Sequence, residues 1–101
     1  MHAIDNTIAN NASEGISGGT NTGSTVFATA TRNLIAENGT GGIRMNNAGT
    51  IGVADGNTVV RNQGFGLIEG AGSTLYTRGN NTVNGNTSGS TSGSPTALGG
   101  V

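Results

Sequence analysis

The sequence has no cysteine, tryptophan or lysine, and it is poor in aromatic, charged and proline residues. Of its 101 residues, 3% are aromatic, 9% are charged and one is proline. Without cysteine the chain has no disulfide scaffold and no thiolate metal site. A net charge of −1, with four arginines, provides no basic face for nucleic acid. No apolar run approaches the roughly 18 residues of a membrane span, so we expect neither a nucleic-acid partner nor a membrane span.

Glycine, asparagine and threonine make up about half of the chain, with 20, 14 and 15 residues. The length allows one domain at most. With 32% hydrophobic residues, burial does not offset the ordering entropy of an ordinary two-layer core. The chain is therefore either a disordered low-complexity segment or a repeat architecture. A regular period decides between them, because high glycine content without a period is typical of disorder.

The period is present as the pattern Asn-x-apolar-x-x-Asn. It occurs four times, at offsets of 27, 24 and 24 residues, over 6–11, 33–38, 57–62 and 81–86. A Gly-Ile or Gly-Leu pair follows each of the first three copies, at 15–16, 42–43 and 66–67. A further apolar residue lies six residues before each of the last three copies, at Phe27, Ile51 and Leu75. The surplus of the first repeat must lie between Ile16 and Phe27, so we expect an insertion loop at 17–24.

Three short apolar patches in about 24 residues are typical of a β-solenoid coil with three strands. Helices are excluded because glycine, asparagine and β-branched residues interrupt every candidate segment. Equivalent residues of successive coils then stack about 4.8 Å apart. The fold class is all-β: a parallel β-helix of about four coils. Its expected core columns are Ile8, Ile35, Val59 and Val83; Ile16, Ile43 and Leu67; and Phe27, Ile51 and Leu75.

The repeated asparagines predict two further columns, one on each side of a strand. Asparagine tolerates left-handed backbone at tight turns, and stacked amides can donate and accept along a column. We favour this structural role over a ligand site. Gly15, Gly42 and Gly66 are expected to allow a close backbone approach. The first asparagine column is Asn6, Asn33, Asn57 and Asn81, and the second is Asn11, Asn38, Asn62 and Asn86.

The Asn-Thr-Val-x-x-Asn-x-x-x-Gly-[Ile/Leu] pattern resembles the repeat of the right-handed parallel β-helix family, the pectate-lyase-like superfamily in its non-catalytic branch. The segment 75–86, LYTRGNNTVNGN, is similar to the closing repeat of many bacterial secreted members. The resemblance covers roughly residues 4–86. It implies right-handed, single-stranded winding and an extracellular or cell-surface location, and the chain shows no signal peptide of its own. The family includes polysaccharide lyases, hydrolases and surface proteins, so the resemblance does not select a function.

The two ends depart from the repeat. Residues 1–86 are expected to form the coils, and 87–101 a Ser/Thr/Gly-rich partial cap or tail, of which we favour the cap, with Leu98 near the end of the core. Met1–Ile4 is expected to be too short to cover a coil. Because solenoids need covered ends, the chain is expected either to continue in a longer helix or to hide Ile8 and Ile16 by self-association.

The acids predict no catalytic pair and no metal site. Stacked in register, Asp5, Glu14, Glu37, Asp55 and Glu69 never share a column. Asp5 is expected over Arg32 and Glu37 over Arg61, as surface ion pairs. Asp55 shares its expected column with Thr31 and Gly79, and Glu69 shares one with Met45. His2, the single histidine, lies at the terminus without a partner acid or nucleophile.

Tyr76 is expected to point outward, below Gly52, and with Arg44 it forms the candidate ligand surface. We therefore expect no enzyme, cofactor or metal. The function expected is a structural or interaction module, the C-terminal part of a secreted or surface β-helix protein, that self-associates through open coil ends. The alternative is a fragment of a polysaccharide-active or carbohydrate-binding β-helix, which needs two acids converging near Tyr76 or Arg44.

Overall fold

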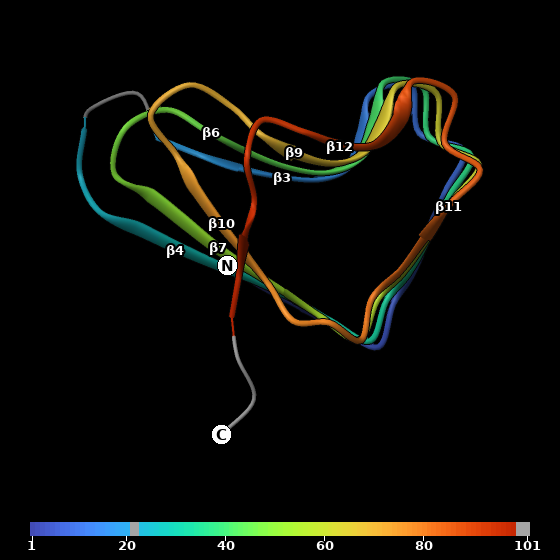
Figure 1. Cartoon of the computed structure of the whole chain (residues 1–101), viewed down its shortest axis with the longest axis horizontal. Coiled ribbons are helices and arrows are strands. Elements are labelled where there is room, and N and C mark those ends of the chain that lie inside the picture. Colours follow the sequence, from blue (N-terminus) through green and yellow to red (C-terminus); the bar gives the residue numbers. More distant parts are fainter. Residues whose placement is uncertain (21–22, 99–101) are drawn as a thin grey trace.

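The chain forms a parallel β-solenoid with about four turns, a spacing of about 24 residues and three strands in each coil. The structure, a computed structural model, describes residues 1–20 and 23–98. From the blue N-terminus to the red C-terminus the chain runs anticlockwise in Figure 1 while it advances toward the viewer, so the winding is right-handed. The body measures 33 × 31 × 23 Å, and the coil axis lies along the shortest dimension.

Three sheets form the walls of the solenoid, and each takes one strand from every coil (Figure 1). Sheet A contains β1 (His2–Ile4), β4 (Val26–Thr31), β7 (Thr50–Asp55), β10 (Thr74–Thr77) and β13 (Thr96–Ala97). Sheet B contains β2 (Thr7–Ala9), β5 (Leu34–Ala36), β8 (Thr58–Val60) and β11 (Thr82–Asn84). Sheet C contains β3 (Glu14–Gly19), β6 (Gly41–Asn46), β9 (Phe65–Glu69) and β12 (Gly89–Ser92).

The first two expected core columns are confirmed by the strand register. In sheet B, Ile8 pairs with Ile35, then Val59, then Val83. In sheet C, Ile16 pairs with Ile43 and then Leu67. Alternation along each short strand turns these aliphatic groups inward, and the inner members are buried, with Ile35 and Val59 at 0% exposure. A thin core therefore forms from few apolar residues.

Glycines within the strands of sheet C let that sheet approach the side chains of sheet B, the close approach expected of them. A methyl group on Gly42 would overlap Val59 and the carbonyl of Gly66. One on Gly66 would overlap Val83. Any larger residue at these two positions would push the sheets apart, because packed cores have no room for an extra methyl group.

The insertion of the first coil lies where the repeat offsets placed it. The register offset between the first two coils is 27 residues at Gly19 and Asn46, and it is 24 residues at Val26 and Thr50. The three extra residues therefore lie between Gly19 and Val26, so the loop begins later than the predicted 17–24, because 17–19 belong to β3. Residues 21–22 of that loop lie outside the described residues.

The third core column is wrong in sheet A. Phe27 is 62% exposed, and Ile51, its partner in register, is half-buried on the same outer face. Leu75 is fully buried, but it pairs with Gly52, and Ile51 pairs with Thr74. A shift of one residue exchanges the two faces of a strand.

Two compensating changes produce this shift. The connection from sheet C to β10 is one residue shorter than its counterpart in the previous coil, and the turn after β10 is one residue longer. Small residues face inward on β4 and β7 because Met45 reaches across from sheet C. A methyl group on Gly52 would lie 2.6 Å from the Met45 sulfur, and that side chain is 2% exposed.

Both ends are more ordered than expected. Met1–Ile4 is not a bare end: β1 pairs with β4, and the Met1 ammonium donates to the Phe27 carbonyl at 3.0 Å. Ile16 is 4% exposed without any partner chain, so of the two residues expected to need cover only Ile8 remains half-buried. At the other end, β12 pairs with β9 and β13 with β10. Residues 87–98 thus finish the fourth coil and begin a fifth, and 99–101 lie outside the described residues.

The faces of sheet A can be tested with Leu75→Ala and Phe27→Ala. We expect Leu75→Ala to lower the free energy of unfolding by about 2–5 kcal/mol because it opens a cavity in a thin core. Phe27→Ala, at an exposed position, should cost less than about 1 kcal/mol. Chemical denaturation of both variants measures this difference. Equal costs for the two would contradict the register described here.

Candidate functional site

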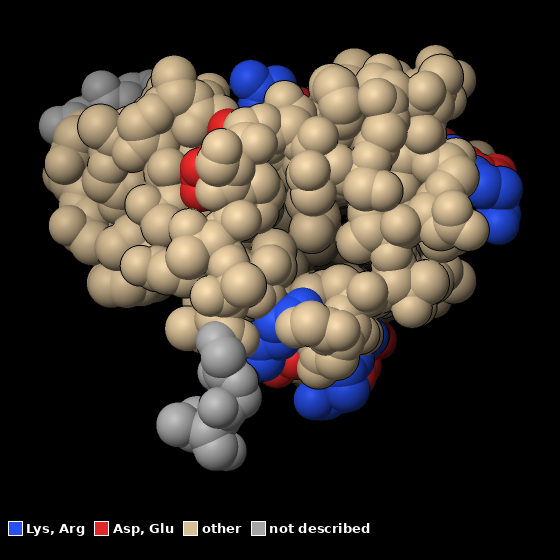
Figure 2. All heavy atoms as spheres, viewed as in Figure 1, with Lys and Arg blue, Asp and Glu red and all other residues tan. Residues whose placement is uncertain are grey.

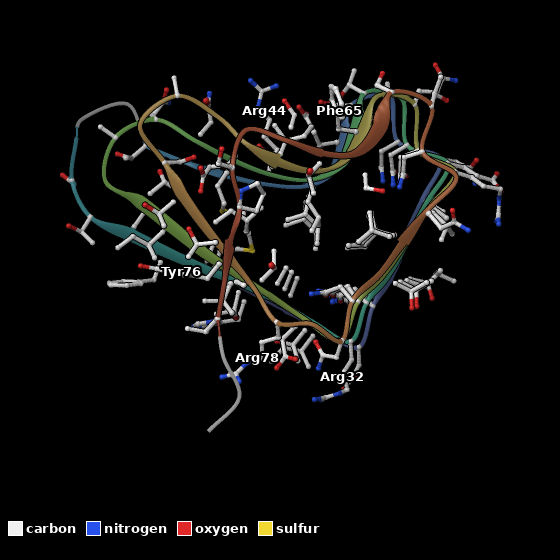
Figure 3. All side chains as sticks on the ribbon, viewed as in Figure 1. Arg32, Arg44, Phe65, Tyr76 and Arg78 are labelled. Atoms are coloured by element: carbon white, nitrogen blue, oxygen red, sulfur yellow. The ribbon has the colours of Figure 1, made fainter. Side chains whose placement is uncertain are left out.

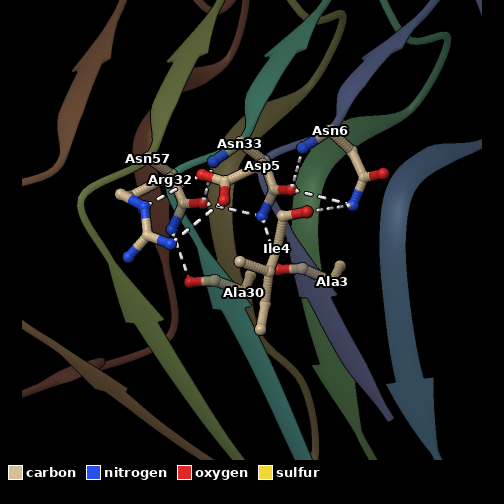
Figure 4. Close-up of polar contacts among 8 residues, drawn as sticks. All are labelled: Ala3, Ile4, Asp5, Asn6, Ala30, Arg32, Asn33 and Asn57. Atoms are coloured by element: carbon tan, nitrogen blue, oxygen red, sulfur yellow. Dashed lines mark hydrogen bonds and ion pairs between the residues drawn. The ribbon is translucent and has the colours of Figure 1, made fainter.

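The first asparagine column is a continuous chain of hydrogen bonds through the corner between sheets A and B (Figure 4). The Asn33 amide donates to Asn57 Oδ1 at 3.0 Å and to the Ala3 carbonyl at 2.8 Å. Asn33 Oδ1 in turn accepts from the backbone N–H of Asn6 at 2.9 Å and from its amide at 3.2 Å. Each inner asparagine therefore joins the coil before it to the coil after it, through both side chain and backbone.

The second asparagine column repeats this arrangement at the corner after sheet B. Asn62 donates to Asn86 Oδ1 at 2.9 Å and to the Ile35 carbonyl at 3.1 Å, and its own Oδ1 accepts twice from Asn38. Asn38 and Asn62 are fully buried. Among the described residues, no buried side-chain nitrogen or oxygen lacks a partner. The columns thus satisfy the polar groups that the corners bury.

The left-handed backbone was expected at the column asparagines, and this is wrong. It occurs at the residue immediately before them. Arg32 has φ 52° before Asn33, and Glu37 and Arg61 have φ 58° and 53° before Asn38 and Asn62. The left-handed residue turns the chain, and the extended asparagine that follows directs its amide along the axis. Glycine, which adopts this conformation with less strain, holds the equivalent position only before Asn57 and Asn86, as Gly56 and Gly85.

Both columns have a direction. Along each, the backbone N–H and the amide of one asparagine donate to the Oδ1 of the asparagine in the next coil. Asn6 and Asn11 begin the columns, and no earlier asparagine in the pattern donates to their Oδ1 atoms. Asn86 is the last asparagine of the sequence. The N-terminal end of the solenoid therefore presents two acceptors, and the C-terminal end presents the backbone donors of Asn81 and Asn86.

The open edges of sheet B carry both donors and acceptors. The Leu34 N–H donates to the Asn6 carbonyl and the Asn10 N–H to the Ala36 carbonyl, so the N–H groups of Thr7 and Ala9 alternate to the open side of β2. At the other end, the Thr82 N–H donates to the Asn57 carbonyl and the Asn84 carbonyl accepts from Arg61. The N–H and carbonyl of Val83 alternate to the open side of β11.

All four arginines pair with carboxylates on the surface. The expected pairs form: Arg32 Nε lies 2.9 Å from Asp5 Oδ1, and Arg61 Nη2 lies 3.1 Å from Glu37 Oε1. Their side chains are more than half exposed, so water and salt screen both pairs and they contribute little to stability. In Figure 2 most charged atoms lie in small mixed groups at the rim, a small acidic patch lies further in on the upper left, and the rest of that surface is uncharged. That face has no field of one sign that would attract a charged ligand.

Two further pairs were not predicted. Arg44 Nη1 lies 3.0 Å from Glu14 Oε1, a diagonal contact that comparison of residues within one column does not reveal. Arg78 Nε lies 3.7 Å from Asp55 Oδ2, and Asp55 was expected to share its column with Gly79. The register shift of sheet A brings Arg78 into that place. Asn80, in the longer turn, adds a bond to Asp55 at 2.6 Å.

The candidate ligand surface of Tyr76 and Arg44 does not form. Figure 3 shows the two side chains on different walls, because Tyr76 belongs to β10 of sheet A and Arg44 to β6 of sheet C. Tyr76 points outward as expected, but it pairs with Val53, not Gly52. The acid nearest Arg44 is Glu14, and it is already engaged by Arg44 and by the Ser13 hydroxyl.

The described residues contain no cluster of three or more histidine, cysteine or acidic side chains that could hold a metal ion. Nor does any helix long and apolar enough to cross a membrane occur in residues 1–20 and 23–98. His2 Nδ1 lies 2.6 Å from the Thr29 hydroxyl, on the outer face of sheet A. A hollow of about 280 Å³ is lined by Thr20, Gly23, Asn47 and Ala48, none of them an acid or a base.

Comparison with known proteins gives no relative for this chain. No protein-family model matches it, and no match was found among curated proteins or among solved structures.

The second asparagine column can be tested with Asn62→Ala. The substitution removes four hydrogen bonds and leaves the Asn38 N–H buried without a partner. We expect a loss of about 3 kcal/mol or more in the free energy of unfolding. The control is Asn84→Ala, an exposed asparagine of the neighbouring coil, which should cost about 0.5 kcal/mol or less. Similar losses in the two variants would contradict a stabilising role for the column.

The pKa of Glu14 provides a test in acid. The Ser13 hydroxyl, followed by the backbone N–H of Glu14 and by Arg44, lowers this pKa below its ordinary value of 4.5. Because the folded pKa is lowered, the stabilisation is complete above the unfolded pKa and is lost as the pH falls through the folded pKa. We expect Ser13→Ala to raise the pKa of Glu14 in an NMR titration. Ser17→Ala, on the same strand, should leave it unchanged, and no response to Ser13→Ala would disprove the assignment.

Proposed function

We propose that this chain is a non-enzymatic structural module that associates with further copies of itself, head to tail, by stacking coil on coil. The observation that carries the proposal is the direction of the two asparagine columns. One end of the solenoid presents the Oδ1 atoms of Asn6 and Asn11, and the other presents the backbone donors of Asn81 and Asn86. Two identical copies therefore complement each other only when the C-terminal end of one meets the N-terminal end of the other. A further coil of a longer chain would bind through the same contacts.

The backbone edges of sheet B support the same arrangement. With β2 of a second copy placed over β11 in the register that links earlier coils, the Thr7 N–H reaches the Asn81 carbonyl. The Val83 N–H reaches the Thr7 carbonyl, and the Ala9 N–H reaches the Val83 carbonyl. These are the bonds that β8 makes with β11 within one chain. Sheet B then continues as a parallel ladder with no unpaired edge at the junction.

Burial at the junction adds an apolar contribution. Ile8 and Val83, the end members of the sheet B core column, are half-buried and pack against the core. Stacking places Ile8 of one copy over Val83 of the other and removes both from water, as Ile35 and Val59 are removed within the chain. The absence of a paired-acid site in the described residues is consistent with a module that acts by association.

The test is Thr7→Pro, compared with Thr7→Val as the matched control. Proline removes the N–H of Thr7, which points to the open side of β2, and it is tolerated at a strand edge. The monomer should therefore keep its circular dichroism and its melting temperature. In sedimentation velocity over a concentration series, the wild type and Thr7→Val should associate, and Thr7→Pro should raise the dissociation constant at least about tenfold, or 1.4 kcal/mol.

A wild type that remains monomeric at millimolar concentration would refute the proposal. So would a Thr7→Pro variant that associates as strongly as Thr7→Val.

A further inference from the structure

The last strand occupies the place that a first strand would take in a following coil. β13 pairs with β10 through Thr96 and Ala97, opposite Tyr76 and Thr77. β1 pairs with β4 through the equivalent columns, with His2 opposite Thr29 and Ala3 opposite Ala30. The inner column of sheet A thus reads Ala3, Ala30, Ala54, Thr77 and Ala97. The outer column reads His2, Thr29, Val53, Tyr76 and Thr96.

This equivalence has a consequence for stacking. When a second copy is placed on the C-terminal end, its β2 continues sheet B over β11 and its β3 continues sheet C over β12. Its β1 must then lie over β10, where β13 of the first copy already lies. The free edge of β10 would then have to pair with both β13 and the incoming β1. The conflict arises because sheet A contains five strands and sheets B and C contain four each.

The contacts of β1 and β13 indicate which of the two strands detaches when a second copy stacks. β1 is held by the Met1 ammonium on the Phe27 carbonyl, by Asn33 on the Ala3 carbonyl and by Asn6 on the Ile4 carbonyl. β13 consists of two exposed residues, paired with β10 alone and extended by a bond from the Leu98 N–H to the Thr77 carbonyl at 2.8 Å. Edge strands this short are weakly held, so β13 is the strand that detaches.

We propose that β13 is a self-blocking strand: it covers the edge of β10 and competes there with β1 of a second copy. The inference rests on the proposed head-to-tail association and names the contact that limits it. Displacement of β13 exposes the N–H and carbonyl groups of β10 to the incoming β1. The exchange also brings His2 of the second copy opposite Tyr76, an aromatic cross-strand pair that Thr96 does not supply.

The test compares Leu98→Pro with Ala97→Pro in the full chain. Leu98→Pro removes the N–H that bonds to Thr77, so β13 loses a hold on β10. Ala97→Pro introduces the same residue one position earlier, where the N–H alternates away from β10, and it leaves that bond in place. Both substitutions lie at an exposed end, and circular dichroism and the melting temperature verify that the coils remain folded.

In sedimentation velocity we expect Leu98→Pro to associate about tenfold more tightly than the wild type, and Ala97→Pro to match the wild type. The double variant Thr7→Pro/Leu98→Pro should return to weak association, because the stack still requires β2. Unchanged or weaker association of Leu98→Pro, in a chain whose wild type stacks and responds to Thr7→Pro, overturns the self-blocking role and leaves the proposed function intact. Weaker association of Ala97→Pro would show that a second copy adds onto β13, which also overturns it. If no variant and no wild type associates, both proposals fall.

Discussion

The hydrogen bond from one asparagine to the Oδ1 of the next is the interaction on which the rest of the structure depends. It fixes the spacing of successive coils and their register, because the side-chain amide and the backbone N–H of Asn33 must both come within 3.0 Å of Asn57 Oδ1. A slip of one residue would bury several amide groups without partners, at a cost of about 1–3 kcal/mol each. With the corners held in this way, each coil needs few large apolar residues, and the glycine-rich composition is compatible with an ordered fold.

The same interaction explains what could be predicted from the sequence. Asparagine is required at 33, 57 and 81 by both its amide and its backbone, so the repeat is visible, and the columns nearest to it, in sheets B and C, follow correctly. Sheet A has no such marker. A residue lost before β10 and one gained after it leave the 24-residue period unchanged, yet they bring Leu75 inward, opposite Gly52, while Ile51 keeps the outward position of Phe27. The repeat period measures only the number of residues between column asparagines. It therefore does not detect a residue lost before a strand and regained after it.

The surface followed a similar division. Asp5 with Arg32 and Glu37 with Arg61 precede column asparagines at the corners, so their pairing could be predicted from equivalent positions. Glu14 with Arg44 is a diagonal contact, and Arg78 with Asp55 depends on the shift in sheet A. The position of β13 could not be predicted either, because Thr96-Ala97-Leu98 shares only its small and apolar character with His2-Ala3-Ile4. Its equivalence to β1 becomes apparent only from the strand register.

The direction of the asparagine columns also means that nothing in the repeating part of the fold sets the number of coils. Every inner coil presents acceptors on one side and donors on the other, so the surroundings of Asn33 and of Asn57 are nearly the same. A coil could be duplicated or removed without changing either end. Such a body is translationally symmetric along its axis, as a one-dimensional crystal is, and coil geometry gives it no preferred length. Its length has to be set at the termini, by residues that break the repeat.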